Sequence, residues 1–161
     1  MRGFQILVAV LSIIFLNACV FEEERAPNIL FIMSDDHTSQ AWGIYGGLLA
    51  PYVKNDGIKT LAEQGVTLEN MFTTNSICVP SRAALLTGVM SHKNGVYTLG
   101  DALSTDSLTI SGLLSDAGYS TAIIGKWHLK EEPTGFDYYK VLPGQGRYFN
   151  PLLKTKKNWE Y

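Results

Sequence analysis

The spacing of hydrophobic and polar residues along this chain is typical of strands in some segments and of helices in others. Three segments are patterned as strands: 28–33 and 119–124 as buried apolar strands, and 66–70 by alternation. Three segments with helical spacing, each followed by a glycine, predict short helices over 56–64, 80–87 and 107–117. Strands that alternate with helices predict an α/β fold built on a largely parallel sheet.

The N-terminal segment has the pattern of an export signal. A positive start precedes an apolar run over 6–16, which is short for a membrane span. The run leads to Leu16-Asn17-Ala18-Cys19, which resembles a bacterial lipoprotein processing box. We expect a signal peptide over 1–18, a lipid on Cys19 that anchors the protein to a membrane, and a tether over 19–26. A cleaved secretory peptide is the alternative, and both predict an exported protein, periplasmic or on the cell surface.

Composition narrows the classes of function. The chain has 161 residues, 46% of them hydrophobic and 17% charged, which indicates a globular domain rather than a disordered segment. A net charge of −2 without a basic stripe argues against a nucleic-acid partner. The two cysteines do not form a disulfide framework, and no Cys/His spacing of the zinc type is present.

The richest candidate chemistry lies at residues 78–82, Cys-Val-Pro-Ser-Arg. Pro80 is suited to the first turn of a helix, so Cys78 falls where free backbone N–H groups and the positive end of the helix dipole meet. Arg82, four residues later, can offer paired donors to a tetrahedral oxyanion at the same place. A buried cysteine at an ordinary helix start is the alternative.

Two further pairs of polar residues follow predicted strands. Asp35 and Asp36 come directly after 28–33, and adjacent carboxylates suit either a hard cation or a solvated turn. Lys126 and His128 follow 119–124, and an extended backbone there would point both side chains to one side. Because ligands bind at the carboxyl edge of open α/β sheets, these segments and the Cys78 segment are expected to meet at one site.

Two longer motifs identify a family. Residues 78–88 read C-x-P-S-R-x-x-L-x-T-G and residues 118–126 read G-Y-x-T-x-x-x-G-K. Both resemble the signatures of the type I sulfatases, which are formylglycine-dependent. The resemblance implies an alkaline-phosphatase-like α/β fold and sulfuric ester hydrolase activity. It also implies that a formylglycine-generating enzyme oxidises Cys78 to Cα-formylglycine.

The family resemblance also implies the roles of the site residues. Calcium would be bound by Asp35, Asp36 and the modified residue 78. One hydroxyl of the hydrated aldehyde would attack sulfur, Arg82 and Lys126 would hold the sulfate oxygens, and His128 would take a proton. His92 corresponds to a histidine that supports the formylglycine in related sulfatases, and a structural or merely exposed histidine is the alternative.

The segment after residue 135 bears on the substrate. Residues 136–139, 141–151 and 34–47 resemble sulfatases that act on 6-O-sulfated N-acetylglucosamine. Aromatic side chains suit a sugar cleft, and Gln145 and Arg147, with Lys126, are the predicted substrate-binding residues. The implied substrates are sulfated glycans such as heparan sulfate or mucin-type glycans.

The resemblance covers only the front part of the family fold. Sulfatases supply a further Asp with an Asn or His for calcium, and another His and Lys for the substrate. No such set occurs before Tyr161. We therefore expect 27–161 to be the N-terminal part of a sulfatase catalytic domain. The alternatives are a zinc phosphatase or phosphodiesterase of the alkaline-phosphatase superfamily, which Cys78 disfavours, and a non-catalytic, surface-tethered binder of sulfated glycans or an inactive fragment.

Overall fold

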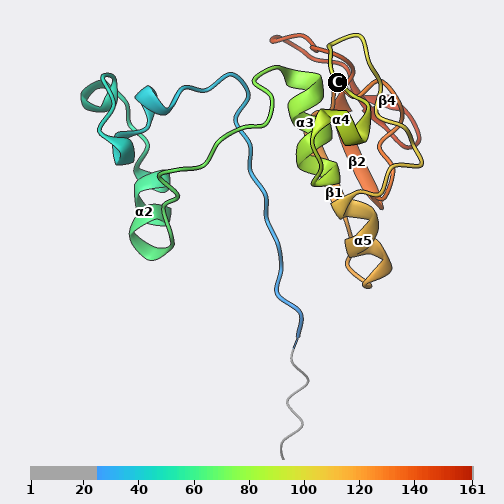
Figure 1. The fold of residues 1–161 in the computed structure, drawn as a ribbon, viewed down its shortest axis with the longest axis horizontal. Helices are drawn as coiled ribbons and strands as arrows, with labels where there is room; N and C mark the ends of the chain where they lie inside the picture. The colour runs from blue at the N-terminus through green and yellow to red at the C-terminus, as the bar shows by residue number, and fades with distance from the viewer. Residues whose placement is uncertain (1–24, 161) are drawn as a thin grey trace, which may run out of the picture. The chain divides into compact units, whose positions relative to one another are not determined.

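A computed structural model describes residues 25–160 of the chain, so the predicted signal peptide and Cys19 lie outside the described residues. The helices and strands are shown in Figure 1. The helical elements are η1 (Ser39–Ala41), η2 (Gly43–Tyr45), η3 (Ala50–Tyr52), α2 (Asp56–Gln64), α3 (Cys78–Thr87), α4 (Ser91–Asn94) and α5 (Ile110–Asp116). The strands are β1 (Ala122–Lys126), β2 (Tyr138–Leu142), β3 (Leu153–Thr155) and β4 (Trp159–Glu160).

The four strands form one mixed sheet in the order β1-β2-β3-β4. β1 pairs with β2 in parallel, with Ala122 opposite Tyr138 and Lys126 opposite Leu142. β2 and β3 are antiparallel, as are β3 and β4. The α/β class is therefore as predicted, but within 25–160 only the β1–β2 pairing is parallel, so this part of the sheet is not largely parallel.

The three helix predictions are confirmed, with differences at their ends. α2 has the predicted bounds, and α3 begins two residues before Pro80, at Cys78. α3 ends at Thr87, and the left-handed φ of 68° at the following Gly88 allows its N–H to bond the carbonyl of Ala84. α5 is shorter than predicted because the Thr109 side chain caps its N-terminus by accepting from the Gly112 N–H.

The strand predictions are less accurate. Residues 28–33 and 66–70 form no strand, since a strand needs a neighbour to take its backbone hydrogen bonds and no described segment pairs with them. Leu30 and Ile32 are 83% and 76% exposed, so the predicted burial of the first run is also wrong for the described residues. The strand predicted over 119–124 is displaced to Ala122–Lys126, and Ile124 on it is 73% exposed rather than buried.

One apolar core joins α3 to the sheet. Its buried side chains are Val79, Ala83, Val96, Leu103, Trp127, Leu129, Tyr139 and Val141. The α3 residues in this set lie immediately beside Cys78 and Arg82 in the sequence. Packing of α3 on the strand ends therefore fixes the position of the residues that carry the candidate chemistry.

A polar brace connects the start of β1 to the segment before β2. Asp137 accepts a hydrogen bond from the Thr121 backbone N–H at 2.8 Å, and the Thr121 hydroxyl donates to the carbonyl of Gly135 at 2.9 Å. Thr121 is buried, so these bonds satisfy polar groups that would otherwise be costly. The threonine of the second motif is thus a structural residue that sets the β1–β2 register.

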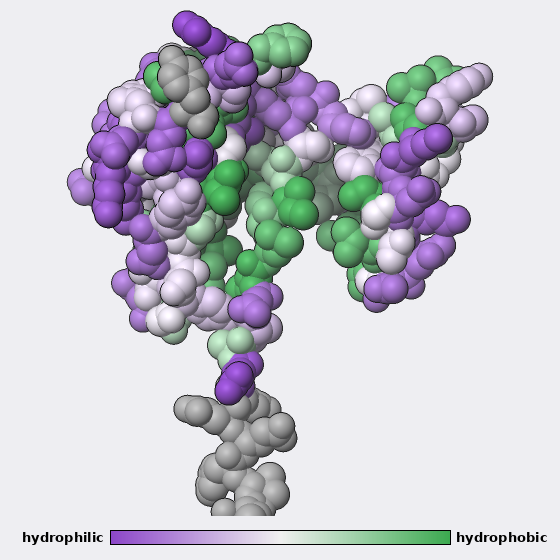
Figure 2. Space-filling model, turned by 180° about the vertical axis from the view of Figure 1, so that it is seen from behind, coloured by the Kyte–Doolittle hydropathy of each residue, from purple (hydrophilic) through white to green (hydrophobic). Residues whose placement is uncertain are grey.

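Much apolar surface remains exposed. Large hydrophobic side chains with more than half of their surface exposed include Phe31, Val66 and Phe72, and green surface of this kind is visible in Figure 2. Among residues 25–160, no helix has the length and hydrophobicity required to cross a membrane.

Candidate active site

Cys78 occupies the first position of α3. The preceding residue, Ile77, is the N-cap and has an extended backbone, and no side chain caps this helix end. The first-turn N–H groups of α3 are therefore directed toward the place where the Cys78 side chain lies. Cys78 is partly buried and its thiol is free. A nucleophile at this position experiences the positive end of the helix dipole.

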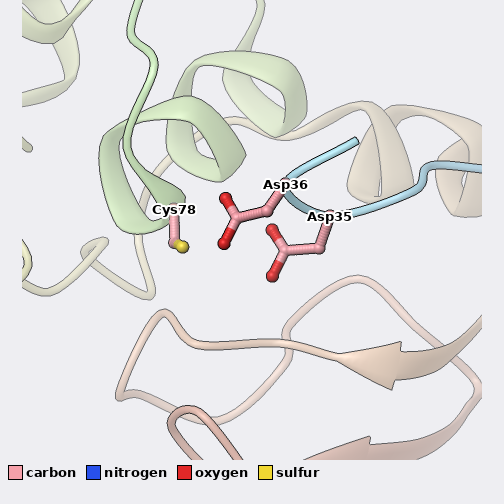
Figure 3. A group of neighbouring side chains, drawn as sticks. All are labelled: Asp35, Asp36 and Cys78. Carbon is pink, nitrogen blue, oxygen red and sulfur yellow. The ribbon is translucent and has the colours of Figure 1, made fainter. Parts of the chain in front are cut away.

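Two carboxylates face Cys78. One ligand atom from each of Asp35, Asp36 and Cys78 can be chosen so that all lie within 4.8 Å of one another. Figure 3 shows the three side chains directed toward a common space. Asp36 adopts a left-handed φ of 50°, which turns the chain so that consecutive carboxylates can reach the same space. The two carboxylates are oxygen donors that suit a hard cation such as calcium, whereas the third group here is a thiol.

Lys126 lies at the centre of the site. Its ammonium donates to Asp35 Oδ2 at 2.5 Å, to Gln145 Oε1 at 2.6 Å and to Cys78 Sγ at 3.3 Å. The Lys126 side chain is only 13% exposed. Lys126 is the last residue of β1, so the end of this strand delivers a cation directly beside the side chain of residue 78.

Arg82 joins the same group from the second turn of α3. Its Nη2 donates to Asp35 Oδ1 at 3.3 Å, and its Nη1 donates to the backbone carbonyl of Lys126 at 2.5 Å. The buried Nε of Arg82 has no hydrogen-bond partner among the described residues. The guanidinium is therefore held against Asp35 and the end of β1 at the same time.

Contacts within this group stabilise the charged forms of Asp35 and Lys126. The hydrogen bond from Lys126 lowers the pKa of Asp35, and Arg82 adds to the effect, which outweighs partial burial. Burial opposes the charged form of Lys126, yet hydrogen bonds to Asp35 and Cys78 raise the pKa of Lys126. Asp35 is thus ionised and Lys126 protonated at neutral pH.

His128 lies near these cations, but not in the way that an extended strand would place it. Its φ of 57° is left-handed, so β1 does not continue through it and the strand alternation does not apply. Burial lowers the pKa of His128, and the positive charges of Lys126 and Arg82 lower it further. Its Nδ1 is buried without a hydrogen-bond partner among the described residues. The imidazole of His128 is therefore neutral at neutral pH and can accept a proton.

The other predicted residues differ in whether they contact this group. His92 is exposed on α4 and makes no hydrogen bond within the described part of the chain. Arg147 is exposed in the segment after β2 and also has no hydrogen-bonded partner among the described side chains. Gln145, predicted to bind substrate, contacts Lys126, and no sequence pattern indicated that contact.

Comparisons with known proteins show which family this chain is similar to. The Sulfatase family model matches residues 27–156. The chain is 44% identical over 133 residues to an N-acetylglucosamine-6-O-sulfatase of Bacteroides thetaiotaomicron, covering 81% of this chain and 23% of that protein. It is 33% identical over 161 residues to human N-acetylgalactosamine-6-sulfatase, covering 84% of this chain and 30% of that protein. The chain thus spans about a quarter of the length of these relatives.

A solved structure gives the same result for the fold. A protein in complex with its substrate D-glucosamine-2-N,6-O-disulfate superposes with a TM-score of 0.80 at 40% sequence identity. The match covers 84% of this chain and 28% of that one. The described residues therefore form part of the alkaline-phosphatase-like α/β fold of the sulfatases. Because the family model matches most of the length of this chain, the chain belongs to the sulfatase family.

Proposed function

We propose that the protein carrying this chain hydrolyses sulfate monoesters of glycans, with residue 78 as the nucleophile. The observation that carries the proposal is the contact of the Lys126 ammonium with both Cys78 and Asp35. Three segments distant in sequence supply these residues, and Arg82 adds a second cation. A sulfate ester resembles a phosphoryl group in charge and geometry, so positioning and charge stabilisation would provide most of the rate enhancement.

The donor set supports calcium as the resident cation. Asp35 and Asp36 offer hard carboxylate oxygens, whereas a thiol at position 78 is a poor ligand for calcium. Oxidation of Cys78 to formylglycine would replace the sulfur by oxygen and complete an all-oxygen set. Bound there, calcium would supply positive charge that polarises oxygen atoms at residue 78 and on the sulfate.

The remaining residues would handle charge and protons. Lys126 and Arg82 are placed to stabilise negative charge on sulfate oxygens next to residue 78. His128 is neutral at neutral pH, because burial and the two cations lower its pKa, and it would accept the proton lost from residue 78 when sulfate is released. Each role uses a protonation state that the surrounding charges favour.

The substrate we propose is 6-O-sulfated N-acetylglucosamine in heparan sulfate or mucin-type glycans. Support comes from the Bacteroides relative, named as an N-acetylglucosamine-6-O-sulfatase, and from the solved protein whose substrate is a 6-O-sulfated glucosamine. Exposed aromatic side chains at Tyr148 and Phe149 are available to stack on sugar rings, next to Arg147. Export through the N-terminal segment and attachment through Cys19 would bring the protein to such polymers.

The maturation of Cys78 is tested by mass spectrometry. The tryptic peptide Thr60–Arg82 from the full-length gene product should carry an aldehyde or its hydrate in place of the thiol. Sequencing the gene beyond the codon for Tyr161 defines that product. An unmodified thiol in active protein would contradict the formylglycine mechanism.

The activity is tested with an aryl sulfate and with 6-O-sulfated N-acetylglucosamine. Cys78→Ala should abolish turnover of both, and a strong calcium chelator should suppress turnover by the parent protein. A Ser76→Ala variant, at an exposed position in the loop just before α3, is the matched control. Absence of sulfate release from a fully matured, calcium-loaded protein would favour a non-catalytic binder of sulfated glycans.

A further inference from the structure

Gln145 is exposed, yet its side chain contacts the catalytic candidate Lys126. Its Oε1 accepts from the Lys126 ammonium at 2.6 Å, one of the three hydrogen bonds that this ammonium makes within residues 25–160. An ammonium has three N–H donors, so Asp35, Cys78 and Gln145 together satisfy all of them. We propose that Gln145 is a positioning residue, which holds the Lys126 ammonium beside residue 78. This inference rests on the proposed sulfatase function.

The backbone around Gln145 is shaped to present its side chain. Residues 143–146 form a turn closed by a hydrogen bond from the Gly146 N–H to the Pro143 carbonyl at 3.1 Å. Gly144 has a φ of 56° and Gly146 a φ of 74°, and a Cβ on Gly146 would lie 2.9 Å from the Leu142 side chain. Glycine on both sides of Gln145 therefore permits a tight turn directly at the end of β2.

The chemistry of the amide fits a positioning role. Lysine has a long, flexible side chain whose ammonium can swing toward any nearby anion. Asp35 attracts this ammonium strongly, and it also pairs with Arg82. Gln145 supplies a second, neutral acceptor that restrains the ammonium without cancelling its charge. The contact with Gln145 therefore restrains Lys126 without adding a negative charge beyond that of Asp35.

A positioning role and a sugar-binding role predict different kinetics. If Gln145 bonded only a sugar hydroxyl, its loss would raise KM for the sugar sulfate and leave a small aryl sulfate unaffected. If it positions Lys126, its loss lowers kcat by the same factor for both substrates. Displacement of a catalytic group by about 1 Å can cost on the order of a hundredfold, so we expect a loss of about ten- to a hundredfold.

Three variants of the matured, full-length protein test the proposal. Gln145→Met keeps the side-chain length but removes the acceptor, and it should lower kcat for both substrates. Gln145→Glu restores an oxygen acceptor and should recover part of the lost kcat. Gln64→Met makes the same substitution at an exposed position on α2 and should leave kcat and KM unchanged. Wild-type kcat in Gln145→Met, or a defect confined to the sugar substrate, overturns the proposal.

A crystal structure of Gln145→Met provides a readout that needs no turnover. The Lys126 ammonium should keep its contact with Asp35 but move away from residue 78 in this variant, relative to the parent protein. An ammonium that keeps its position overturns the positioning role, whether or not the parent protein hydrolyses sulfate esters. Absence of sulfate release by the parent, with the ammonium displaced in the variant, overturns only the proposed function.

Discussion

Arg82 donates a hydrogen bond from its Nη1 to the backbone carbonyl of Lys126 at 2.5 Å. The two residues belong to the two separate sequence motifs, 44 positions apart. The other arm of the guanidinium, Nη2, contacts Asp35 at 3.3 Å. One side chain on α3 therefore links the helix, the end of β1 and the acidic pair, so the site is held together as a unit.

Replacing Arg82 by lysine should show that its forked geometry matters more than its charge. A lysine cannot reach the Lys126 carbonyl and Asp35 with two fixed arms. We expect the free energy of unfolding to fall by about 1.5–3 kcal/mol, the range for hydrogen bonds of charged groups. Chemical denaturation measures this change, and Arg25→Lys at an exposed position is the control. Unchanged stability in Arg82→Lys would argue against the bridging role.

The two aspartates should respond differently to conversion to asparagine. Asp35 pairs with both Lys126 and Arg82, so Asp35→Asn leaves two cations without their anion and should destabilise metal-free protein by about 1–2 kcal/mol. Asp36 forms neither an ion pair nor a side-chain hydrogen bond within residues 25–160, and asparagine tolerates its left-handed φ. Asp36→Asn should therefore keep the stability measured in chelator.

Isothermal titration calorimetry with calcium tests whether the two aspartates also bind the metal. If both side chains hold calcium, each asparagine variant should bind the ion more weakly than the parent, including Asp36→Asn with its unchanged stability. Parent-like calcium affinity in Asp36→Asn would exclude this carboxylate from the metal site.

Tyr139 should make stability depend on pH in the alkaline range. Its buried hydroxyl donates to the Glu132 carboxylate, and this bond, with burial, raises the pKa of Tyr139 from 10.0 to about 12. Between these values the unfolded chain has already lost the proton that the folded protein retains. The free energy of unfolding should therefore fall as the pH rises from 10.0 to about 12.

Chemical denaturation at several alkaline pH values checks the Tyr139 prediction by comparing how the free energy of unfolding of the parent and of two variants depends on pH. Tyr139→Phe should lose this part of the slope, whereas Tyr97→Phe, at an exposed tyrosine, should keep the parent slope. Parallel curves for the parent and Tyr139→Phe would contradict the assignment.

Gly135 tests the packing between α5 and the segment before β2. Its φ is 73°, and a Cβ there would lie 2.6 Å from the Gly112 backbone nitrogen. Backbone atoms cannot move aside as a flexible side chain can, so Gly135→Ala should destabilise the protein by several kcal/mol. Overpacking costs about 1–3 kcal/mol, and the strain of an alanine at positive φ adds to it.

Gly57 provides the matched glycine-to-alanine control. It lies in α2 with open space around its would-be Cβ, so Gly57→Ala should stabilise the protein by about 0.5–1 kcal/mol. Thermal melts of both variants measure the contrast. A Gly135→Ala variant as stable as the parent would show that α5 does not pack as tightly as the contact indicates.

Local signals in the sequence were enough for the helices and for the family. α2 and α3 form where apolar spacing, Pro80 and terminal glycines all favour a helix, and each of these signals acts within a few residues. The motifs at 78–88 and 118–126 indicated the sulfatase family, which the family model confirms. Both conclusions depend on residue identity at fixed spacing rather than on contacts.

Strand positions could not be predicted in the same way. An apolar run such as 28–33 favours burial, but it becomes a strand only if another segment pairs with it, and periodicity does not report partners. The bounds of β1 were displaced for a related reason, because the Thr121–Asp137 brace and the pairing with β2 set where the strand starts.

The residue types that the site uses can be read from the sequence: a cysteine at a helix start, adjacent carboxylates, an arginine and a lysine. Their contacts come from the fold, in which Lys126 bonds Asp35, Cys78 and Gln145 together and His92 takes no part in these bonds. The physical reason is that hydrogen bonds across many residues depend on how α3 and the strand ends pack, and no local pattern encodes that packing.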